Sequence, residues 1–330
     1  MFKSKKMLSI LCLGAASLMP AASLADDVLI GNIAPVAAQP SQAILADAIA
    51  KFAAEEGWSY RMLDANLSPD RQVSHVDTFV TLGADVIASW SLDPNAVAAA
   101  YTRAQQQGVK VIGVNSDGQG VDQSVWWDVQ ICVPGGVYER NANWIAERKP
   151  GAKVIVFGGP PVPSIQNNKA CFIDAAEAAG LEVIATPDNT QDTTANAAAM
   201  AADLLVRHPD VEAVWAYNDN TALGFSASLF ASGKTVWKAG EEGGVMVFGT
   251  NGDEIAIDAV RSGRLTGTWD PDYIAFGGAV VLMAKQLLET PDAAPEPLVV
   301  RSMLVTAETV DDYIENEDRE YTLESLPLVK

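Results

Sequence analysis

The sequence has few of the residues that build most hydrolytic and metal sites. It contains two histidines, His75 and His208, and three cysteines among 330 residues. Both histidines fall on predicted helices, and no G-x-S-x-G or H-E-x-x-H motif and no closely spaced cysteine pair is present. Residues 188–192 match a calcium loop only in part, because its sixth-position glycine and distal glutamate are missing. We therefore expect a protein that is not an enzyme, with no catalytic residue, no metal ion and no cofactor.

Basic residues and long apolar segments are also scarce. Lysine and arginine together number 22 against 42 acidic residues, which gives a net charge of -20. Nucleic acids and anionic membrane surfaces bind basic patches, so we expect neither as a partner. No apolar stretch is long enough for a membrane helix, so we expect no direct membrane insertion.

The N-terminal segment has the pattern of a secretory signal. Three lysines precede a short apolar run at 7–18, and small residues follow at 22–25. A basic region, a short apolar core and a small-residue cleavage site are typical of a signal peptide. We expect cleavage after Ala25, which leaves a periplasmic mature chain with a net charge of about -23.

Two cysteines, Cys132 and Cys171, remain in that mature chain. In an oxidising compartment they could form a disulfide. Two separate buried thiols are the alternative, because the sequence does not give the Cα separation that a disulfide requires.

Strand and helix patterns alternate along nearly the whole mature chain, and the alternation starts again near residue 130. The strands are continuous apolar runs, as in parallel sheets that are covered on both faces. This pattern predicts an α/β fold of two doubly wound, Rossmann-like lobes with parallel sheets. The expected elements include helices at 137–148, 167–179 and 194–207 and a strand at 153–157. A single strand at 298–305 is expected after a proline-rich linker.

The most informative segment follows the apolar strand expected at 211–217. The strand ends at Asn218-Asp219-Asn220, and a small-residue helix follows at once. In an open parallel sheet, ligands bind beyond the carboxyl ends of the strands. Side chains that donate and accept hydrogen bonds at that position suit a hydroxyl-rich small molecule. The alternative is that Asp219 or Asn220 only caps the helix.

Several short motifs together resemble one known family. Residues 83–87 read G-A-D-V-I, residues 108–112 read G-V-K-V-I, and residues 247–252 read V-F-G-T-N-G. The segment 211–224 gives the closest match. With the order of elements over residues 28–305, these motifs resemble periplasmic sugar-binding proteins of the ribose-binding type, which are the receptors of ABC importers.

The resemblance implies the type I periplasmic binding protein fold, in which a multi-strand hinge joins the two lobes. It divides the chain into a signal peptide at 1–25, an N-terminal lobe at 26–129 plus 269–298, a C-terminal lobe at 130–268 plus 299–306, and a tail at 307–330.

The resemblance also implies a set of ligand-binding residues. Asn218 stands where the family has a ligand-binding Asn, with Asp219 beside it, and Asn251 occupies the place of an Asp. The other positions that it places at or near the ligand are Gln39, Gln42, Trp90, Asn115, Asp117, Asn167, Lys169, Trp269 and Asp270. The family's arginines are absent at Ser116 and near Asn167, and Ser41 and Gln42 replace a pair of phenylalanines, so ribose itself is not the expected ligand.

Aromatic and acidic residues add further candidates. A tryptophan face packs well against the C–H face of a sugar ring, and Trp90, Trp127 and Trp269 are the candidates for that role. Trp215 lies inside an apolar strand and is expected in the core. Asp192, in the loop before its helix, could face the cleft. A pocket rich in acids and poor in arginine favours a neutral sugar or polyol, leaves a cationic ligand open, and disfavours an anionic one.

The resemblance implies that the protein closes over its ligand by a hinge motion and delivers it to a membrane permease. We expect a monomer. Similar folds also present ligands to a membrane histidine kinase, and the sequence V-W-W-D at 125–128 departs from the transporters' usual V-x-x-D-N. A periplasmic sensor subunit is therefore the open alternative.

Overall fold

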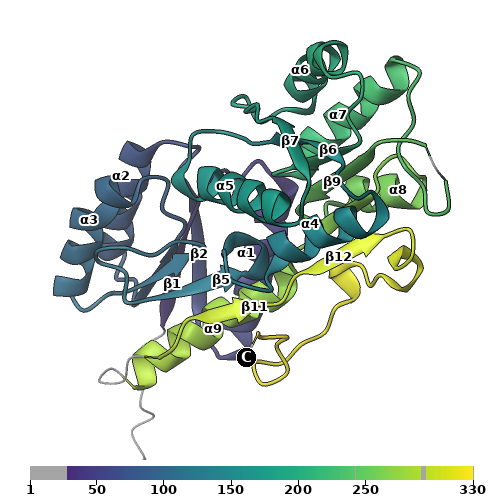
Figure 1. Ribbon diagram of the computed structural model, residues 1–330. Helices are drawn as coiled ribbons and strands as arrows, with labels where there is room; N and C mark the ends of the chain where they lie inside the picture. Colours follow the sequence, from purple (N-terminus) through teal and green to yellow (C-terminus); the bar gives the residue numbers. More distant parts are fainter. Residues whose placement is uncertain (1–27, 242, 291–294, 330) are drawn as a thin grey trace, which may run out of the picture.

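The fold consists of two α/β lobes, each built on one six-stranded sheet (Figure 1). The computed structural model describes residues 28–241, 243–290 and 295–329. The signal peptide expected at 1–25 lies outside these residues. Within the described part of the chain, no helix has the length and apolar character needed to cross a membrane.

The first lobe contains a fully parallel sheet in the order β11-β5-β4-β3-β1-β2. Helices α1 and α9 share one apolar core with this sheet, and α2 and α3 share another. Its elements are β1 (Leu29–Ala34), α1 (Pro40–Glu55), β2 (Ser59–Asp64), α2 (Pro69–Thr81), β3 (Val86–Ser89), α3 (Pro94–Gln106), β4 (Lys110–Val114), β5 (Gln123–Trp127), α9 (Tyr273–Glu289) and β11 (Leu298–Val300).

The second lobe contains a sheet in the order β12-β10-β9-β8-β6-β7, in which only β12 is antiparallel to its neighbour. Helices α4 and α5 contribute to one apolar core and α6, α7 and α8 to the other. Its elements are α4 (Val137–Arg148), β6 (Lys153–Phe157), α5 (Pro163–Ala178), β7 (Glu182–Ala185), α6 (Thr194–Arg207), β8 (Ala213–Ala216), α7 (Asp219–Ala231), β9 (Met246–Thr250), α8 (Glu254–Arg261), β10 (Gly267–Asp270) and β12 (Met303–Thr306).

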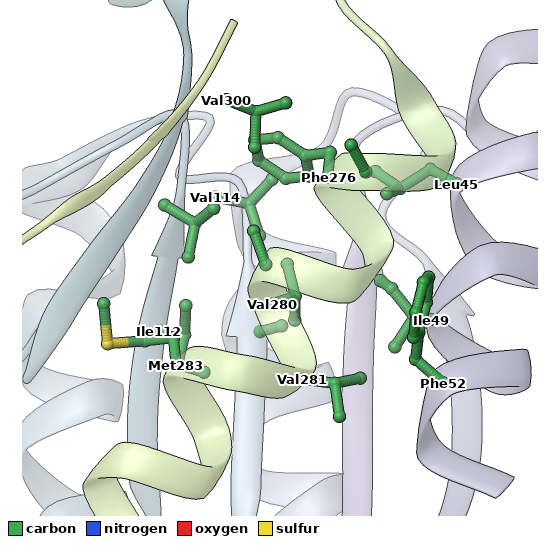
Figure 2. Packing of buried hydrophobic residues seen from close by; sticks show 14 of the residues in the cluster. Leu45, Ile49, Phe52, Ile112, Val114, Phe276, Val280, Val281, Met283 and Val300 are labelled. Atoms are coloured by element: carbon green, nitrogen blue, oxygen red, sulfur yellow. The ribbon is translucent and has the colours of Figure 1, made fainter. Parts of the chain in front are cut away.

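Helix α9 supplies the centre of the first lobe's largest core. Figure 2 shows its apolar side chains between helix α1 and the sheet. The labelled members, all buried, are Leu45, Ile49 and Phe52 of α1, Ile112 and Val114 of β4, Phe276, Val280, Val281 and Met283 of α9, and Val300 of β11. Burial of such side chains contributes roughly 1.5–3 kcal/mol each. This core brings a late helix of the chain against the first one.

The disulfide left open by the sequence is formed. Cys132 and Cys171 are bonded, with their Cα atoms 6.0 Å apart. The bridge joins the segment after β5 to helix α5, and so fixes the chain where it first passes from one lobe to the other.

Two of the expected elements differ from the structure by more than their end residues. The segment 298–305 forms two strands, because β11 pairs with β5 in the first lobe and β12 pairs with β10 in the second. Helix α5 begins at Pro163 rather than at Asn167, since proline fits the first turn of a helix. The lobe and tail boundaries expected from the sequence stay a prediction.

Candidate ligand-binding site

A cavity of about 80 Å³ lies between the two lobes. Loops that follow parallel strands of both sheets supply its walls. Residues 35–42, 67, 90–92, 127 and 273 contribute from the first lobe, and residues 130, 160–168, 192, 217–218 and 251 lie on the side of the hinge and second lobe. The site is therefore at the carboxyl ends of the strands, where the sequence led us to expect it.

Seven residues expected at the ligand line this cavity. They are Gln39, Gln42, Trp90, Trp127, Asp192, Asn218 and Asn251.

Asp192 is the point at which the polar side chains of the cavity converge. Its carboxylate accepts hydrogen bonds from Gln39 Nε2 at 2.8 Å, from Asn218 Nδ2 at 2.7 Å, and from the Tyr217 hydroxyl. Its backbone has a φ of 53°, in the left-handed region, which an aspartate tolerates better than most residues. Burial raises the pKa of Asp192, although the three hydrogen bonds oppose that shift.

Two hydrogen bonds cross from one lobe to the other at this site. One is the bond from Gln39, which precedes helix α1, to Asp192, which precedes α6. The second joins Trp90 Nε1 to Ser164 Oγ of α5, at 3.3 Å. Both bonds connect side chains that face each other across the cleft, so the lobes are held in a closed arrangement.

Trp90 and Trp127 form the aromatic part of the cavity. Their ring centroids are 5.5 Å apart in an edge-to-face arrangement. The ring centroids of Trp127 and Tyr273 are 5.2 Å apart in the same kind of arrangement. Buried Gln72 fixes the loop that carries Trp90: its Nε2 donates to the Trp90 carbonyl at 2.6 Å, and its Oε1 accepts from the Leu92 amide at 3.0 Å. The indole N–H of Trp127 is buried and has no hydrogen-bond partner among the described residues.

Asn218 has two roles, and Asp219 has a different one from that expected. Asn218 Oδ1 accepts from the Thr221 amide at 3.0 Å and so caps helix α7, a role that the sequence had suggested for Asp219 or Asn220. The side chain of Asp219 does not reach the cavity. It is buried, and it accepts from the Asp253 amide at 2.9 Å and from Thr268 Oγ1 at 2.6 Å. Burial and the nearby Asp253 raise the pKa of Asp219 well above its usual value.

Asp270 and Trp269 also lie outside the cavity. Asp270 is fully buried and pairs with Arg319 of the C-terminal segment, so its carboxylate is already occupied. Trp269 is buried, and its indole N–H donates to Asn141 Oδ1 at 3.2 Å. Neither side chain lines the cavity between the lobes.

The remaining expected residues are displaced from the cavity by local contacts. Asn115, Asp117 and Asn167 line a neighbouring cavity instead. Lys169 lines neither cavity, and its Nζ is paired with Asp188 at 2.8 Å. Lys169, which lies near the position where the resemblance places a family arginine, therefore adds no cation to the lining of either cavity.

Sequence reasoning missed four polar or aromatic residues that line the cavity: Tyr217, Gln130, Asn168 and Tyr273. Tyr217 could have been found, because it is the last residue of the strand expected at 211–217. Asn168 could not, because the sequence does not show which face of helix α5 turns toward the cleft.

The chemistry of the cavity follows from this lining. Six amide side chains, two phenols and one carboxylate offer both donors and acceptors, and two indoles offer flat apolar faces. None of the described residues that line it is Lys, Arg or His. Within the described part of the chain, no group of three or more His, Cys, Asp or Glu residues is arranged to hold a metal ion. The arrangement suits recognition of hydroxyl groups more than proton transfer or metal chemistry.

Comparison with known proteins agrees with this geometry. The family model described as the periplasmic binding protein domain matches residues 30–292. The chain belongs to this family. It is 30% identical to the ribose import binding protein of Salmonella typhimurium over 241 residues, which cover 72% of this chain and 77% of that protein. It is also 26% identical to the xylitol-binding protein of Mycolicibacterium smegmatis over 258 residues, which cover 76% of this chain and 70% of that one.

Solved structures of periplasmic binding proteins share the fold. An ABC transporter solute-binding protein from Bacillus halodurans with bound myo-inositol superposes with a TM-score of 0.74 at 20% identity, covering 87% of this chain and 97% of that one. A solute-binding protein from Burkholderia graminis in complex with D-arabinose gives a TM-score of 0.76 at 18% identity, covering 88% of this chain and 98% of that one. The two-lobed type I periplasmic binding fold is thereby established, and proteins of this family bind solutes and are not enzymes.

Proposed function

We propose that this protein is the periplasmic receptor of an ABC importer and that it binds a neutral sugar or polyol between its lobes. The observation that carries the proposal is the convergence of Gln39, Tyr217 and Asn218 on the Asp192 carboxylate inside the interlobe cavity. Relatives named for ribose and xylitol binding support the ligand class, and the names of the ribose relatives support a role in import.

The residue types fit a polyhydroxy ligand. Each hydroxyl donates one hydrogen bond and accepts two, and amide and carboxylate side chains satisfy both needs. A hydrogen bond from a hydroxyl to an ionised carboxylate such as Asp192 is stronger than one between neutral groups. Trp90 and Trp127 offer apolar surface to the C–H groups of a ring or chain. An acid would meet the Asp192 carboxylate without a cation to offset it, so anionic ligands are disfavoured.

Binding is proposed to work by stabilising the closed state. A ligand hydroxyl group can take the place of Gln39 at Asp192, and other hydroxyls can bond to the first lobe at the same time. The ligand then bridges the lobes and shifts the population toward closure. The closed form is the one proposed to dock on the permease. No observation among the relatives favours the sensor alternative.

A binding experiment tests the ligand class. Calorimetry and thermal unfolding are measured with D-ribose, D-allose, xylitol and myo-inositol, and with D-gluconate and choline for comparison. We expect at least one neutral compound to bind with micromolar affinity, about -8 kcal/mol, and to raise the melting temperature by mass action. Binding of only gluconate or only choline would contradict the proposal.

Asn218→Ser provides the matched variant. Serine keeps an oxygen that can cap helix α7 but loses the Nδ2 donor that now bonds to Asp192. We expect the free energy of unfolding without ligand to change by less than about 1 kcal/mol, and the affinity for the neutral ligand to fall at least tenfold. Unchanged affinity would remove Asn218 from the site.

Export, oligomeric state and the importer partner belong to the same proposal. N-terminal sequencing of the exported protein should begin at Asp26, and size-exclusion chromatography should give a monomer. In a reconstituted importer, the ligand-bound protein should stimulate ATP hydrolysis by the permease complex. Stimulation of a histidine kinase instead would favour the sensor alternative.

A further inference from the structure

The interlobe cleft continues beyond Trp90 into a second cavity of about 430 Å³, which we call the outer chamber. The cavity around Asp192 is the inner chamber. Gln130 lines both chambers. Neighbouring residues of one loop divide between them, because Trp90 lines the inner chamber and Ser91 the outer one. Two such cavities with a shared residue and shared loops are compartments of a single cleft.

A side-chain pair from the two lobes forms the partition between the chambers. Trp90 Nε1 of the inner chamber donates to Oγ of Ser164, a residue that lines the outer chamber, at 3.3 Å. This distance is longer than the usual 2.7–3.2 Å for an N–H···O bond, so the contact is a weak one. Neither partner is fully buried, and a hydroxyl of a ligand can replace Ser164 as the acceptor for the indole N–H.

The outer chamber is polar, and most of its lining side chains can bond to hydroxyls. It is lined by Asn115, Asp117 and Asn167 and by half-buried Trp126, and none of its described lining residues is Lys, Arg or His. Asn115 is fully buried: its Oδ1 accepts from the Trp127 amide at 2.8 Å, and its Nδ2 has no hydrogen-bond partner among the described residues. An unpaired buried donor is rare in native proteins, and it marks a place where a ligand acceptor is favourable.

We propose that the outer chamber is a second sugar subsite, so that the cleft binds a ligand of two linked units, one in each chamber. The inference rests on the proposed function, because it requires a sugar or cyclic polyol in the inner chamber. The second unit is a neutral ring that bonds to the amides of Asn115 and Asn167 and packs on Trp126. The linkage between the two units passes Trp90 in place of its contact with Ser164.

Calorimetry with matched one-unit and two-unit probes tests this subsite. The pairs are D-glucose with cellobiose and maltose, D-galactose with lactose and melibiose, D-xylose with xylobiose, and myo-inositol with galactinol. We expect one two-unit probe to bind at least tenfold more tightly than its one-unit counterpart. If a one-unit probe binds and no two-unit probe binds more tightly than its counterpart, the subsite is overturned and the proposed function stands. If none of these compounds binds, the subsite is overturned, and the proposed function fails as well only if D-ribose, D-allose and xylitol also do not bind.

Asn167→Trp separates the two chambers in the same experiment. Asn167 is an exposed residue of α5 that lines only the outer chamber, so a large side chain there fills that chamber. We expect the variant to lose at least tenfold in affinity for the two-unit probe while its affinity for the one-unit probe stays within twofold. Ala170→Trp, on an exposed position of α5 that lines neither chamber, is the control and should change neither affinity. An equal loss for both probes in Asn167→Trp, or an equal effect of the two variants, would overturn the subsite.

Discussion

Arg319 of the C-terminal segment forms a buried ion pair with Asp270, the last residue of β10. The same guanidinium lies 3.3 Å from Asp272, which caps helix α9. Around this pair, Tyr313 packs against the core of the second lobe and Leu326 against that of the first. The segment after β12 therefore spans both lobes at the point where β10 leads into α9. It also accounts for the absence of Asp270 from the ligand cavity.

Removing Arg319 should destabilise the protein strongly. Arg319→Ala leaves two buried carboxylates without their cation, and breaking a buried pair in this way costs about 3–5 kcal/mol. Urea unfolding measures the change in the free energy of unfolding. Arg103→Ala is the control, because Arg103 forms an exposed pair with Asp77 and its loss should cost less than about 1 kcal/mol. Equal effects of the two variants would show that the tail does not hold β10.

The disulfide should contribute a comparable amount of stability. Cys132 and Cys171 are 39 residues apart, and closing a loop of that length in the unfolded chain is worth about 3–4 kcal/mol in the chain-entropy model. We expect the double variant Cys132→Ser/Cys171→Ser to lose about 2–4 kcal/mol in urea unfolding. Wild-type protein treated with dithiothreitol should match the double variant, and the double variant should not respond to dithiothreitol. A wild-type protein that does not respond to reduction would contradict this prediction.

Asp253 should lower the free energy of unfolding as the pH rises from about 4 to above 6, which is the opposite of the effect of a carboxyl group with a lowered pKa. Burial raises the pKa of Asp253 to about 6, helped by the charges of Asp270 and Asp192 and opposed by a hydrogen bond from Asn251. A carboxyl whose pKa is higher in the folded state than in the unfolded state stabilises the fold at low pH. That contribution is complete below about pH 4 and is lost as the pH rises through about 6.

Asp253→Asn isolates this effect. The asparagine stays neutral, so we expect the variant to gain stability relative to the wild type as the pH rises from 4 to 7.5. The gain should be on the order of 2–3 kcal/mol, the free-energy equivalent of the pKa shift. Urea unfolding at four pH values in this interval measures it. A constant difference between the two proteins would mean that Asp253 titrates in the folded protein as it does in the unfolded chain.

The sequence predicted the elements well wherever a local pattern determines them. The helices at 137–148 and 194–207 and the strand at 153–157 have the expected bounds, because apolar runs and helix periodicity are properties of consecutive residues. The prediction of a single strand at 298–305 was wrong, because distant residues determine how this segment pairs. Its division depends on which distant strands, β5 and β10, are available for pairing.

The site was predictable to the extent that strand ends determine it. Asn218 lies two residues after the end of β8 and Asn251 directly follows β9, so their place at the cleft follows from the topology. The direction of a side chain is not determined in this way. Asn115 follows β4 but turns its Oδ1 to the Trp127 amide, and Asp270 ends β10 but is held by Arg319, 49 residues later. Such long-range polar pairs leave no periodic trace in the sequence.

The hydrogen bond from Gln39 to Asp192 should raise the fraction of closed molecules in the ligand-free protein. Gln39 precedes helix α1, but its side chain makes no capping bond to that helix and reaches across the cleft instead. A hydrogen bond to a charged group is worth about 1.5–3 kcal/mol, so losing it shifts the ratio of closed to open molecules about tenfold or more. We expect Gln39→Ala to enlarge the radius of gyration of the ligand-free protein in small-angle X-ray scattering.

Gln166→Ala is the matched control for this experiment. Gln166 also donates through Nε2, but its acceptors are the carbonyls of Gly159 and Pro160 in its own lobe, at 3.2 and 3.1 Å. Its loss removes hydrogen bonds of the same kind without removing a contact between the lobes, so the radius of gyration should stay at the wild-type value. Adding Ser164→Ala to Gln39→Ala removes the acceptor for the Trp90 indole N–H as well, and should open the protein further. If Gln39→Ala and Gln166→Ala scatter identically, packing between the lobes and not this bond keeps the cleft closed.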